Sequence, residues 1–259
     1  MIKFFRQIRF KLMETGKTSK YLKYAFGEIV LVVLGILIAF SINNWNENRI
    51  NSQKEVLYLT GFKNDLTTQI EALNFRIEFY NSVINMAESI LSDFSKTGKL
   101  LEIDHINSKL SKMMYSLGYP ERKTTFNEIT ATGHVGLIKS KDLRTKIINY
   151  YQFSETNSLS VDSNKSEVFY GKIFPIISSS TILLAENFEF KTNTVNKNLL
   201  EKQLSKIFET QLKDPSNSFN IINAVSMRLI LAKTNLSSVE EGQKFAKYLL
   251  KLIEMELSN

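Results

Sequence analysis

The residue types that most often hold metals or carry out catalysis are scarce in this sequence of 259 residues, which has two histidines and no cysteine. A zinc site needs three or four ligands, and neither His105 nor His134 has a second histidine at ligand spacing. We therefore expect surface or capping histidines, no bound metal and no cofactor. The lack of cysteine also excludes disulfides and thiolate nucleophiles, and it is compatible with an oxidising compartment.

Acidic pairs and tyrosines are the other residues that could take part in catalysis or ligand binding, but a structural role explains both more simply. Glu240 and Glu241, like Glu254 and Glu256, are one or two residues apart, so on a helix they point to different faces. A hydrolase triad built from distant Ser, His and Asp stays open, because triads are defined by geometry. We nevertheless predict that the chain is not an enzyme, because no catalytic motif stands out in the sequence. The aromatic stripe that includes Tyr80, Tyr150, Tyr151 and Tyr170 is more typical of a core than of a ligand site.

Glu28 is different, because it interrupts an otherwise apolar run. A carboxylate within a membrane helix is costly unless it is paired, neutralised or close to the interface. Glu28 is near enough to one end of the run to reach the interface, or it binds another membrane helix. Gly27, Gly35 and Ala39 are four or eight residues apart, which leaves one helix face small enough for a close neighbour. We predict that Glu28 and this face dock a partner helix, from a second copy or from another subunit.

The apolar run from Tyr24 to Ile42 predicts a transmembrane signal-anchor helix. At about 1.5 Å per helical residue it just spans a hydrocarbon core of about 30 Å. Tyr21 and Tyr24 stand at one end and Trp45 at the other, where aromatic rings settle at a bilayer interface. A buried core helix is the first alternative, but it would show a polar stripe. A cleaved signal peptide is the second, but the stretch before the run is long for one.

The positive charge of the chain is concentrated before this run. Seven basic residues against two acidic ones give residues 1–42 a net charge of +5, out of +7 for the whole chain. By the positive-inside rule this places the N-terminus in the cytoplasm, and it argues against nucleic-acid binding, which would need a basic folded domain. We expect a basic cytoplasmic tail (1–23), a transmembrane helix in the lipid bilayer (24–42) and an extracytoplasmic helical domain (43–259).

The exported part is expected to be all-α. Only 10 glycines and 3 prolines occur, too few for the turns of a β-sandwich or barrel. A helix that continues the membrane segment to about Lys96 carries apolar residues in alternating steps of four and three, as in the seam of a helical bundle or coiled coil. Packing within the chain is favoured over a dimeric stalk. The seam residues are Leu66, Ile70, Leu73, Ile77, Tyr80, Ile84, Ala87, Leu91 and Phe94.

Shorter helices are predicted for the rest of the chain. Glycine, proline and capping residues mark their ends. The stretch 186–198 is expected to be a loop whose Phe188 and Phe190 plug the core. The predicted helices are 104–117 with Asp104 as N-cap, 125–132 with Gly133 as C-cap, 141–185 with a bend at Pro175, 199–212, 215–233 with Asp214 as cap, and 238–257 with a capping box of Ser237 and Glu240.

Three stretches of the sequence resemble a known family. They are IKFFRQIRFKL near the N-terminus, GEIVLVVLGILIAFSINNWNE from Gly27 to Glu47, and TFNEITATGHVGLIKSKDLRTKIINYY from Thr125 to Tyr151. They are similar to a large uncharacterised family of bacterial single-pass membrane proteins, classed only as a domain of unknown function. The resemblance covers roughly a quarter of the chain. It implies a diderm envelope, hence an inner-membrane protein with a periplasmic domain, and it implies no activity.

Three functions are compatible with this organisation. The first is a non-enzymatic accessory or scaffold subunit of an envelope complex, which predicts an exposed apolar patch. The second is a sensor that binds a small molecule and signals through a membrane partner, which predicts a pocket between bundle helices. The third is an unrecognised enzyme, which predicts titratable groups converging in a cleft. We favour the first, because the tail of 1–23 is too short for an output domain.

Overall fold

The computed structural model describes residues 6–7, 10, 18–184 and 196–258. Its helical content is 87%, and no strand occurs among the described residues, so the all-α prediction is confirmed. The chain divides into two compact units, Met1–Leu57 and Tyr58–Asn259. The predicted divisions at residues 23 and 42 are finer than this and stay predictions.

The first unit contains the start of helix α2, Thr18–Thr97. From Ala25 this helix is long and apolar enough to cross a membrane by length and composition, and its most apolar stretch has no buried side chain. A signal sequence near the N-terminus also meets these two criteria, whereas a core helix that meets them would be mostly buried. The observation therefore favours a segment whose apolar surface is covered by something outside the chain.

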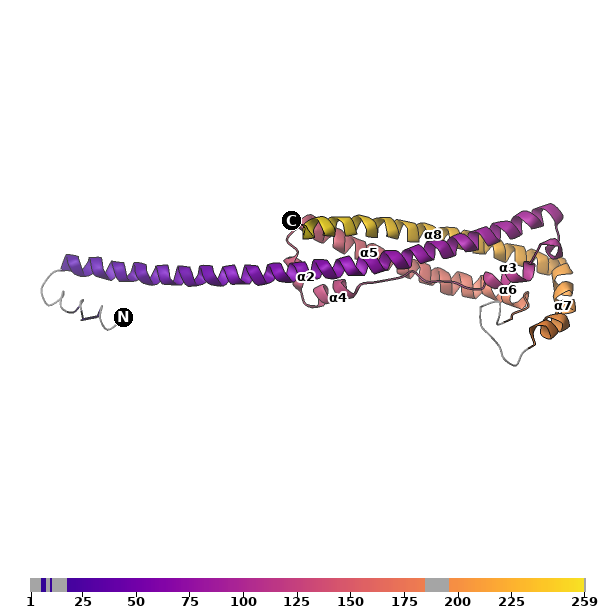
Figure 1. The fold of residues 1–259 in the computed structure, drawn as a ribbon, viewed down its shortest axis with the longest axis horizontal. Coiled ribbons are helices and arrows are strands. Elements are labelled where there is room, and N and C mark those ends of the chain that lie inside the picture. Colours follow the sequence, from indigo (N-terminus) through magenta and orange to yellow (C-terminus); the bar gives the residue numbers. More distant parts are fainter. Residues whose placement is uncertain (1–5, 8–9, 11–17, 185–195, 259) are drawn as a thin grey trace. The chain divides into compact units, whose positions relative to one another are not determined.

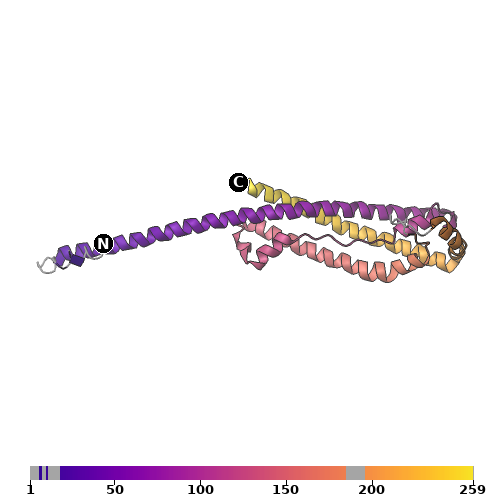
Figure 2. The ribbon, with the colours of Figure 1, turned by 60° about the horizontal axis from the view of Figure 1, so that its bottom comes forward.

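The second unit is a bundle in which three long helical segments lie side by side (Figures 1 and 2). They are the remainder of α2, the segment formed by α5 (Lys141–Ser163), the π-helix η3 (Asn164–Ile173) and α6 (Phe174–Ser179), and α8 (Pro215–Leu257). The shorter elements are η1 (Leu100–Glu102), α3 (Ile106–Lys112), α4 (Thr124–Ala131), η2 (His134–Leu137) and α7 (Lys197–Lys213).

The seam predicted along α2 packs within the bundle. One core cluster joins Leu66 to α5 and α8, and a second joins Leu73 and Tyr80 to the same two helices. A third joins Ala87 to η3, α6 and α8. These four side chains are at most 1% exposed. The apolar stripe of α2 therefore packs against helices of the same chain, which is the alternative that the sequence favoured over a dimeric stalk.

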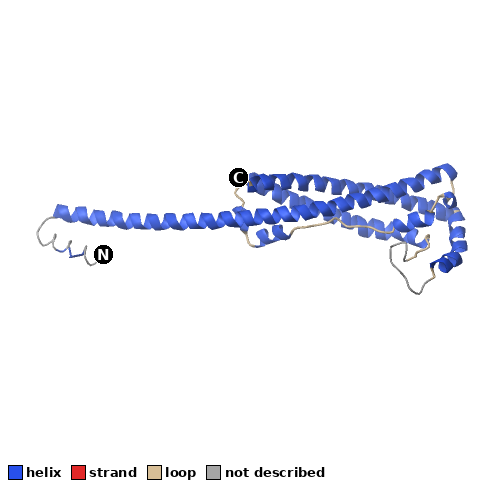
Figure 3. Cartoon of the chain, viewed as in Figure 1, coloured by secondary structure: helices blue, strands red, loops and turns tan. Residues whose placement is uncertain are grey.

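The helix predicted at 104–117 is shorter than expected. It begins at Ile106, after His105 in a left-handed conformation with a φ of 57°, and Asp104 is not its cap. It ends at Lys112, and residues 115–123 are non-helical (the long tan line before α4 in Figure 3). Sequence pattern could not reveal this early end, because side chains distant in sequence satisfy the backbone of the segment, as described below.

The helix predicted at 141–185 is interrupted by the π-helix and ends at Ser179. The Phe174 N–H bonds the Phe169 carbonyl, five residues back. Pro175 has no N–H to continue the α-helical pattern, which favours the wider spacing just before it. At the other end, Ser140 caps the helix by accepting the Leu143 N–H at 3.2 Å. The expected core contacts of Phe188 and Phe190 lie outside the described residues.

The two helices predicted at 215–233 and 238–257 are a single helix of 43 residues. Its start is as predicted, since Asp214 accepts the Asn217 N–H at 2.8 Å ahead of Pro215. The supposed break around Ser237 does not occur. The capping box of Ser237 and Glu240 predicted a new helix start there, but Asn235, just before it, is only 1% exposed and donates to the buried Tyr80 hydroxyl from within a continuous helix.

Candidate functional site

The residues predicted to contact a partner helix all lie in α2, within the first unit. Glu28, Gly35 and Ala39 are seven and eleven residues apart, so they share one helix face. A Cβ added at Gly27 or Gly35 would meet no atom within 4 Å. This face therefore has room for a close neighbour, and its predicted role in docking stays a prediction.

The predicted interface anchors also lie in α2. Trp45, the only tryptophan, is 68% exposed. Tyr21 and Tyr24 are helical residues at the N-terminal end of the apolar run. The placement of these three rings at the two surfaces of a bilayer stays a prediction.

Neither histidine takes part in a cluster of potential metal ligands. His134 accepts or donates a hydrogen bond through Nδ1 to the Tyr58 hydroxyl at 2.8 Å, while His105 precedes α3. No group of three His, Cys, Asp or Glu side chains suited to a metal ion occurs among the residues that could be described. The histidines thus have structural positions near helix ends.

The most unusual side chain in the bundle is Arg228 of α8, which is completely buried. Its Nη2 donates to the Tyr115 carbonyl at 2.7 Å, and its guanidinium carbon lies 4.8 Å from the centre of the Phe169 ring. Nε and Nη1 have no partner among the described atoms. Burial lowers the pKa of Arg228 to about 10, although the nearby Tyr80 acts in the opposite direction. An isolated buried charge is costly, so this arginine needs a structural explanation.

The non-helical segment 115–123 supplies that explanation, because its carbonyls need donors that a helix would have provided. Four side chains of the bundle donate to it, three of them from one face of α2, where Gln69, Arg76 and Tyr80 are seven and four residues apart. The bonds are Arg228 Nη2 to Tyr115 O at 2.7 Å, Tyr80 Oη to Leu117 O at 2.8 Å, Arg76 Nε to Gly118 O at 2.8 Å and Gln69 Nε2 to Pro120 O at 2.5 Å.

Tyr80 also begins a chain of polar contacts across the bundle. The Asn235 amide donates to the Tyr80 hydroxyl at 3.4 Å, and the Asn164 amide donates to Asn235 at 3.1 Å. Burial raises the pKa of Tyr80, so its hydroxyl stays protonated and can donate to Leu117. Asn164 is the first residue of the π-helix, and the polar chain therefore links α2, α8 and η3 through the core.

Tyr119 fixes the same segment sterically. It is 6% exposed, and burial raises its pKa to about 12. A Cβ at Gly242 of α8 would collide with its hydroxyl, so only glycine allows the two elements to come this close. The segment 115–123 is thus held by side-chain donors along its length and by close packing near its middle.

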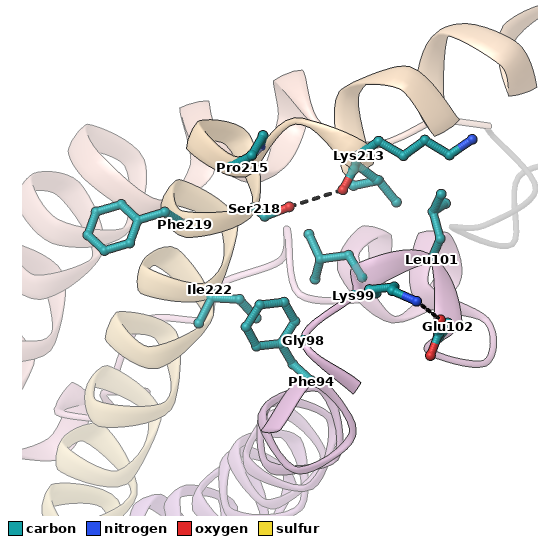
Figure 4. Close-up of a pocket in the computed structure, with 12 residues that line it drawn as sticks. Phe94, Gly98, Lys99, Leu101, Glu102, Lys213, Pro215, Ser218, Phe219 and Ile222 are labelled. Atoms are coloured by element: carbon teal, nitrogen blue, oxygen red, sulfur yellow. Dashed lines mark hydrogen bonds and ion pairs between the residues drawn. The ribbon is translucent and has the colours of Figure 1, made fainter. Parts of the chain in front are cut away.

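A cavity of about 680 Å³ opens at the end of the bundle where α2 finishes. Its walls come from the end of α2, from η1, and from the junction of α7 and α8 (Figure 4). Most of the lining is apolar, and the polar side chains include two lysines. The lining residues are Phe94, Gly98, Lys99, Leu100, Leu101, Glu102, Leu212, Lys213, Pro215, Ser218, Phe219 and Ile222.

The model of a protein family described as "Family of unknown function (DUF6090)" matches residues 28–196 of this chain. The chain belongs to this family. This match confirms the part of the sequence prediction that assigned the chain to a family of unknown function. No curated protein and no solved structure matches the chain. The DUF6090 match begins at Glu28, includes α5 and the π-helix, and stops before α7, so Arg228 and the α7–α8 wall of the cavity lie beyond it.

Sequence reasoning missed Arg228, the polar chain and the cavity. The seam of α2 was visible because its apolar residues recur at a fixed step, but Gln69 and Arg76 look like ordinary surface residues in that pattern. The only available signal was Tyr119–Pro120 after Gly118, which marks a break without showing that the chain then runs through polar donors.

Proposed function

We propose that this DUF6090 protein is a single-pass inner-membrane protein of a diderm bacterium, with its N-terminus in the cytoplasm and its helical domain in the periplasm. The observation that carries the proposal is the apolar stretch of α2, none of whose side chains is buried by the rest of the chain. The excess of basic residues before that stretch supports the orientation.

The lack of native cysteine allows a direct test of this topology. Single cysteines are introduced as Thr18→Cys, before the apolar stretch, and Ser258→Cys, near the C-terminus. Spheroplasts are then treated with a membrane-impermeant maleimide, before and after lysis. We expect Ser258→Cys to be labelled in spheroplasts and Thr18→Cys only after lysis. The reverse pattern would overturn the orientation, and labelling of a soluble chain without detergent would overturn the anchor.

Within the envelope, the chain acts as a non-enzymatic accessory or scaffold subunit. The small face of α2 and Glu28 contact the membrane helix of a partner, either a second copy or another subunit. Glu28→Leu, or Gly35→Leu to add bulk, should abolish cross-linking to that partner in intact membranes. Val30→Leu, on the other side of the helix, is the matched control and should leave cross-linking unchanged. Equal cross-linking by all three variants would contradict the docking role.

A second candidate is a sensor that binds a small molecule in its helical domain. The cavity of about 680 Å³ favours it, because its volume lies within the usual range of roughly 300–1,000 Å³ for ligand sites. Filling the cavity by Ile222→Trp should change which proteins are cross-linked, whereas Tyr248→Trp, at an exposed position of the same helix, should not. An identical set of cross-links from both variants would count against a sensor.

A further inference from the structure

The cavity at the end of the bundle combines a buried apolar base with an exposed rim. Leu100 is completely buried and Leu212 is 2% exposed, so the cavity reaches the main core of the domain. Phe219, which also lines it, is 68% exposed. When an apolar ligand covers an aromatic ring this exposed, apolar surface is removed from water and the free energy of the system falls.

The charged side chains of the rim favour an anion. Lys99 bonds Glu102 at 2.7 Å, so these two charges largely neutralise each other (Figure 4). Among the residues that the structure describes, the one acidic partner of Lys213 is Glu209, at 3.9 Å, and both side chains are more than half exposed. Such an exposed and long ion pair is weak, so the Lys213 ammonium can exchange Glu209 for the anionic head of a ligand.

The remaining polar side chain of the lining is already engaged. The Ser218 hydroxyl donates to the Leu212 carbonyl at 3.0 Å, which leaves it poorly placed to select a ligand (Figure 4). The cavity therefore offers an apolar surface for a hydrocarbon chain and, at its rim, one weakly paired ammonium, that of Lys213, for a head group.

We propose that this cavity binds an amphipathic anion, with a single acyl chain against the apolar lining and a carboxylate or phosphate head at Lys213. This ligand class deepens the sensor role and rests on it for its biological meaning. Both a free fatty acid and an anionic lipid have this chemistry.

The test uses the full chain in nanodiscs of zwitterionic lipid, with one introduced cysteine carrying an environment-sensitive dye. Ser216→Cys places the dye beside Pro215 at the cavity, and Ser160→Cys, another exposed helical serine, is the control on α5. Decanoate, decanol and decyltrimethylammonium are titrated, since they share a tail and differ in charge. We expect a saturable response to decanoate at Ser216→Cys alone, about fourfold tighter for each added methylene.

Variants of the lining test the two parts of the site separately. Ile222→Trp should weaken decanoate binding at least about tenfold by filling the cavity, while Tyr248→Trp should not. Lys213→Glu should weaken decanoate binding roughly three- to tenfold and leave decanol unchanged. Lys206→Glu, which makes the same charge change on an exposed face of α7, is its matched control and should have no effect.

A second nanodisc preparation that contains anionic phospholipid distinguishes the two sources. A dye response without decanoate there identifies bilayer lipid as the ligand, whereas a response only to added decanoate identifies a free acid. Equal responses to the three decyl compounds, or a response unaffected by Ile222→Trp, would overturn the proposal. The sensor role fails by a different result, namely unchanged cross-linking in Ile222→Trp.

Discussion

The two units of this protein differ in how much charge their apolar regions contain. In the first unit, α2 satisfies its own backbone by helical hydrogen bonds, and its apolar stretch is interrupted by a single charge at Glu28. In the second, a non-helical segment runs along the bundle, and Arg228 is buried where it donates to the carbonyl of Tyr115. Charge is thus nearly excluded where the backbone needs no help and retained where the backbone lacks donors.

This difference separates what a membrane segment and a protein core require. A membrane helix needs only an apolar surface and closed backbone hydrogen bonds. A core that includes a non-helical segment must provide side-chain donors for the backbone carbonyls of that segment. Here the donors are Gln69, Arg76, Tyr80 and Arg228. The bundle therefore contains polar side chains at positions that apolar ones could occupy, and these polar side chains fix the path of the segment 115–123.

The largest expected effect, on membrane insertion, comes from adding charge to the apolar stretch of α2 in the first unit. Leu34→Arg with Ile38→Arg, one helical turn apart, should make membrane insertion less favourable by roughly 5–7 kcal/mol, because each central arginine costs about 2.5–3.5 kcal/mol. We expect the double variant to be released from membranes by alkaline carbonate, while Leu34→Ala with Ile38→Ala stays in the pellet. Full retention of the arginine variant would mean that this stretch does not cross a bilayer.

Removing the charge from the other unit should cost less. Arg228→Ala leaves a cavity and an unpaired Tyr115 carbonyl, so the domain should lose roughly 3–5 kcal/mol of unfolding free energy. Arg228→Met fills most of the volume without a buried charge and should stay within about 1 kcal/mol of the natural protein. Urea unfolding of the full chain, followed by circular dichroism, measures both. Equal losses in the two variants would show that the guanidinium itself stabilises the fold.

The sequence predicted the all-α class, the seam of α2 and most helix ends, because these depend on neighbours within a few residues. Gly133 and Asp214 are examples, since a left-handed glycine and a capping aspartate act locally. The path of 115–123 depends instead on Arg228, which is 113 residues from Tyr115 in the chain. No periodicity within either segment contains that information.

The same distinction explains why one helix was predicted as two. Ser237 and Glu240 match a capping box, and locally that pattern is as good as the one at Asp214. Tertiary contacts decide between them, because Asn235 bonds Tyr80 from the interior of a continuous helix. The cavity was equally beyond prediction, since its walls come from two segments, residues 94–102 and 212–222, that are more than 100 residues apart in the chain.

Alkaline pH offers a smaller test of how the core holds its segment. Burial raises the pKa of Tyr119 from 10.0 to about 12, so the folded protein favours the neutral phenol. Its contribution is present below pH 10 and is lost as the pH rises from 10 towards 12, by about 2–3 kcal/mol in unfolding free energy. Tyr119→Phe should reduce the slope of stability against pH in this range. Tyr248→Phe, at a half-exposed position, is the control, and an equal reduction by both would contradict a special role for Tyr119.

The smallest effect expected concerns Gly242, which brings α8 against Tyr119. Gly242→Ala should destabilise the domain by roughly 1–3 kcal/mol, because the added Cβ meets the Tyr119 hydroxyl and the segment must shift. Tyr119→Phe in that background removes the oxygen and should recover part of the loss, as a double-mutant cycle would measure. Gly171→Ala is the contrasting control, since its Cβ would make only an ordinary contact, 3.6 Å from the Ser166 carbonyl oxygen. If Gly242→Ala were as harmless as Gly171→Ala, the segment 115–123 would be free to move away from α8, and the donors that line its path would be holding it without the help of close packing.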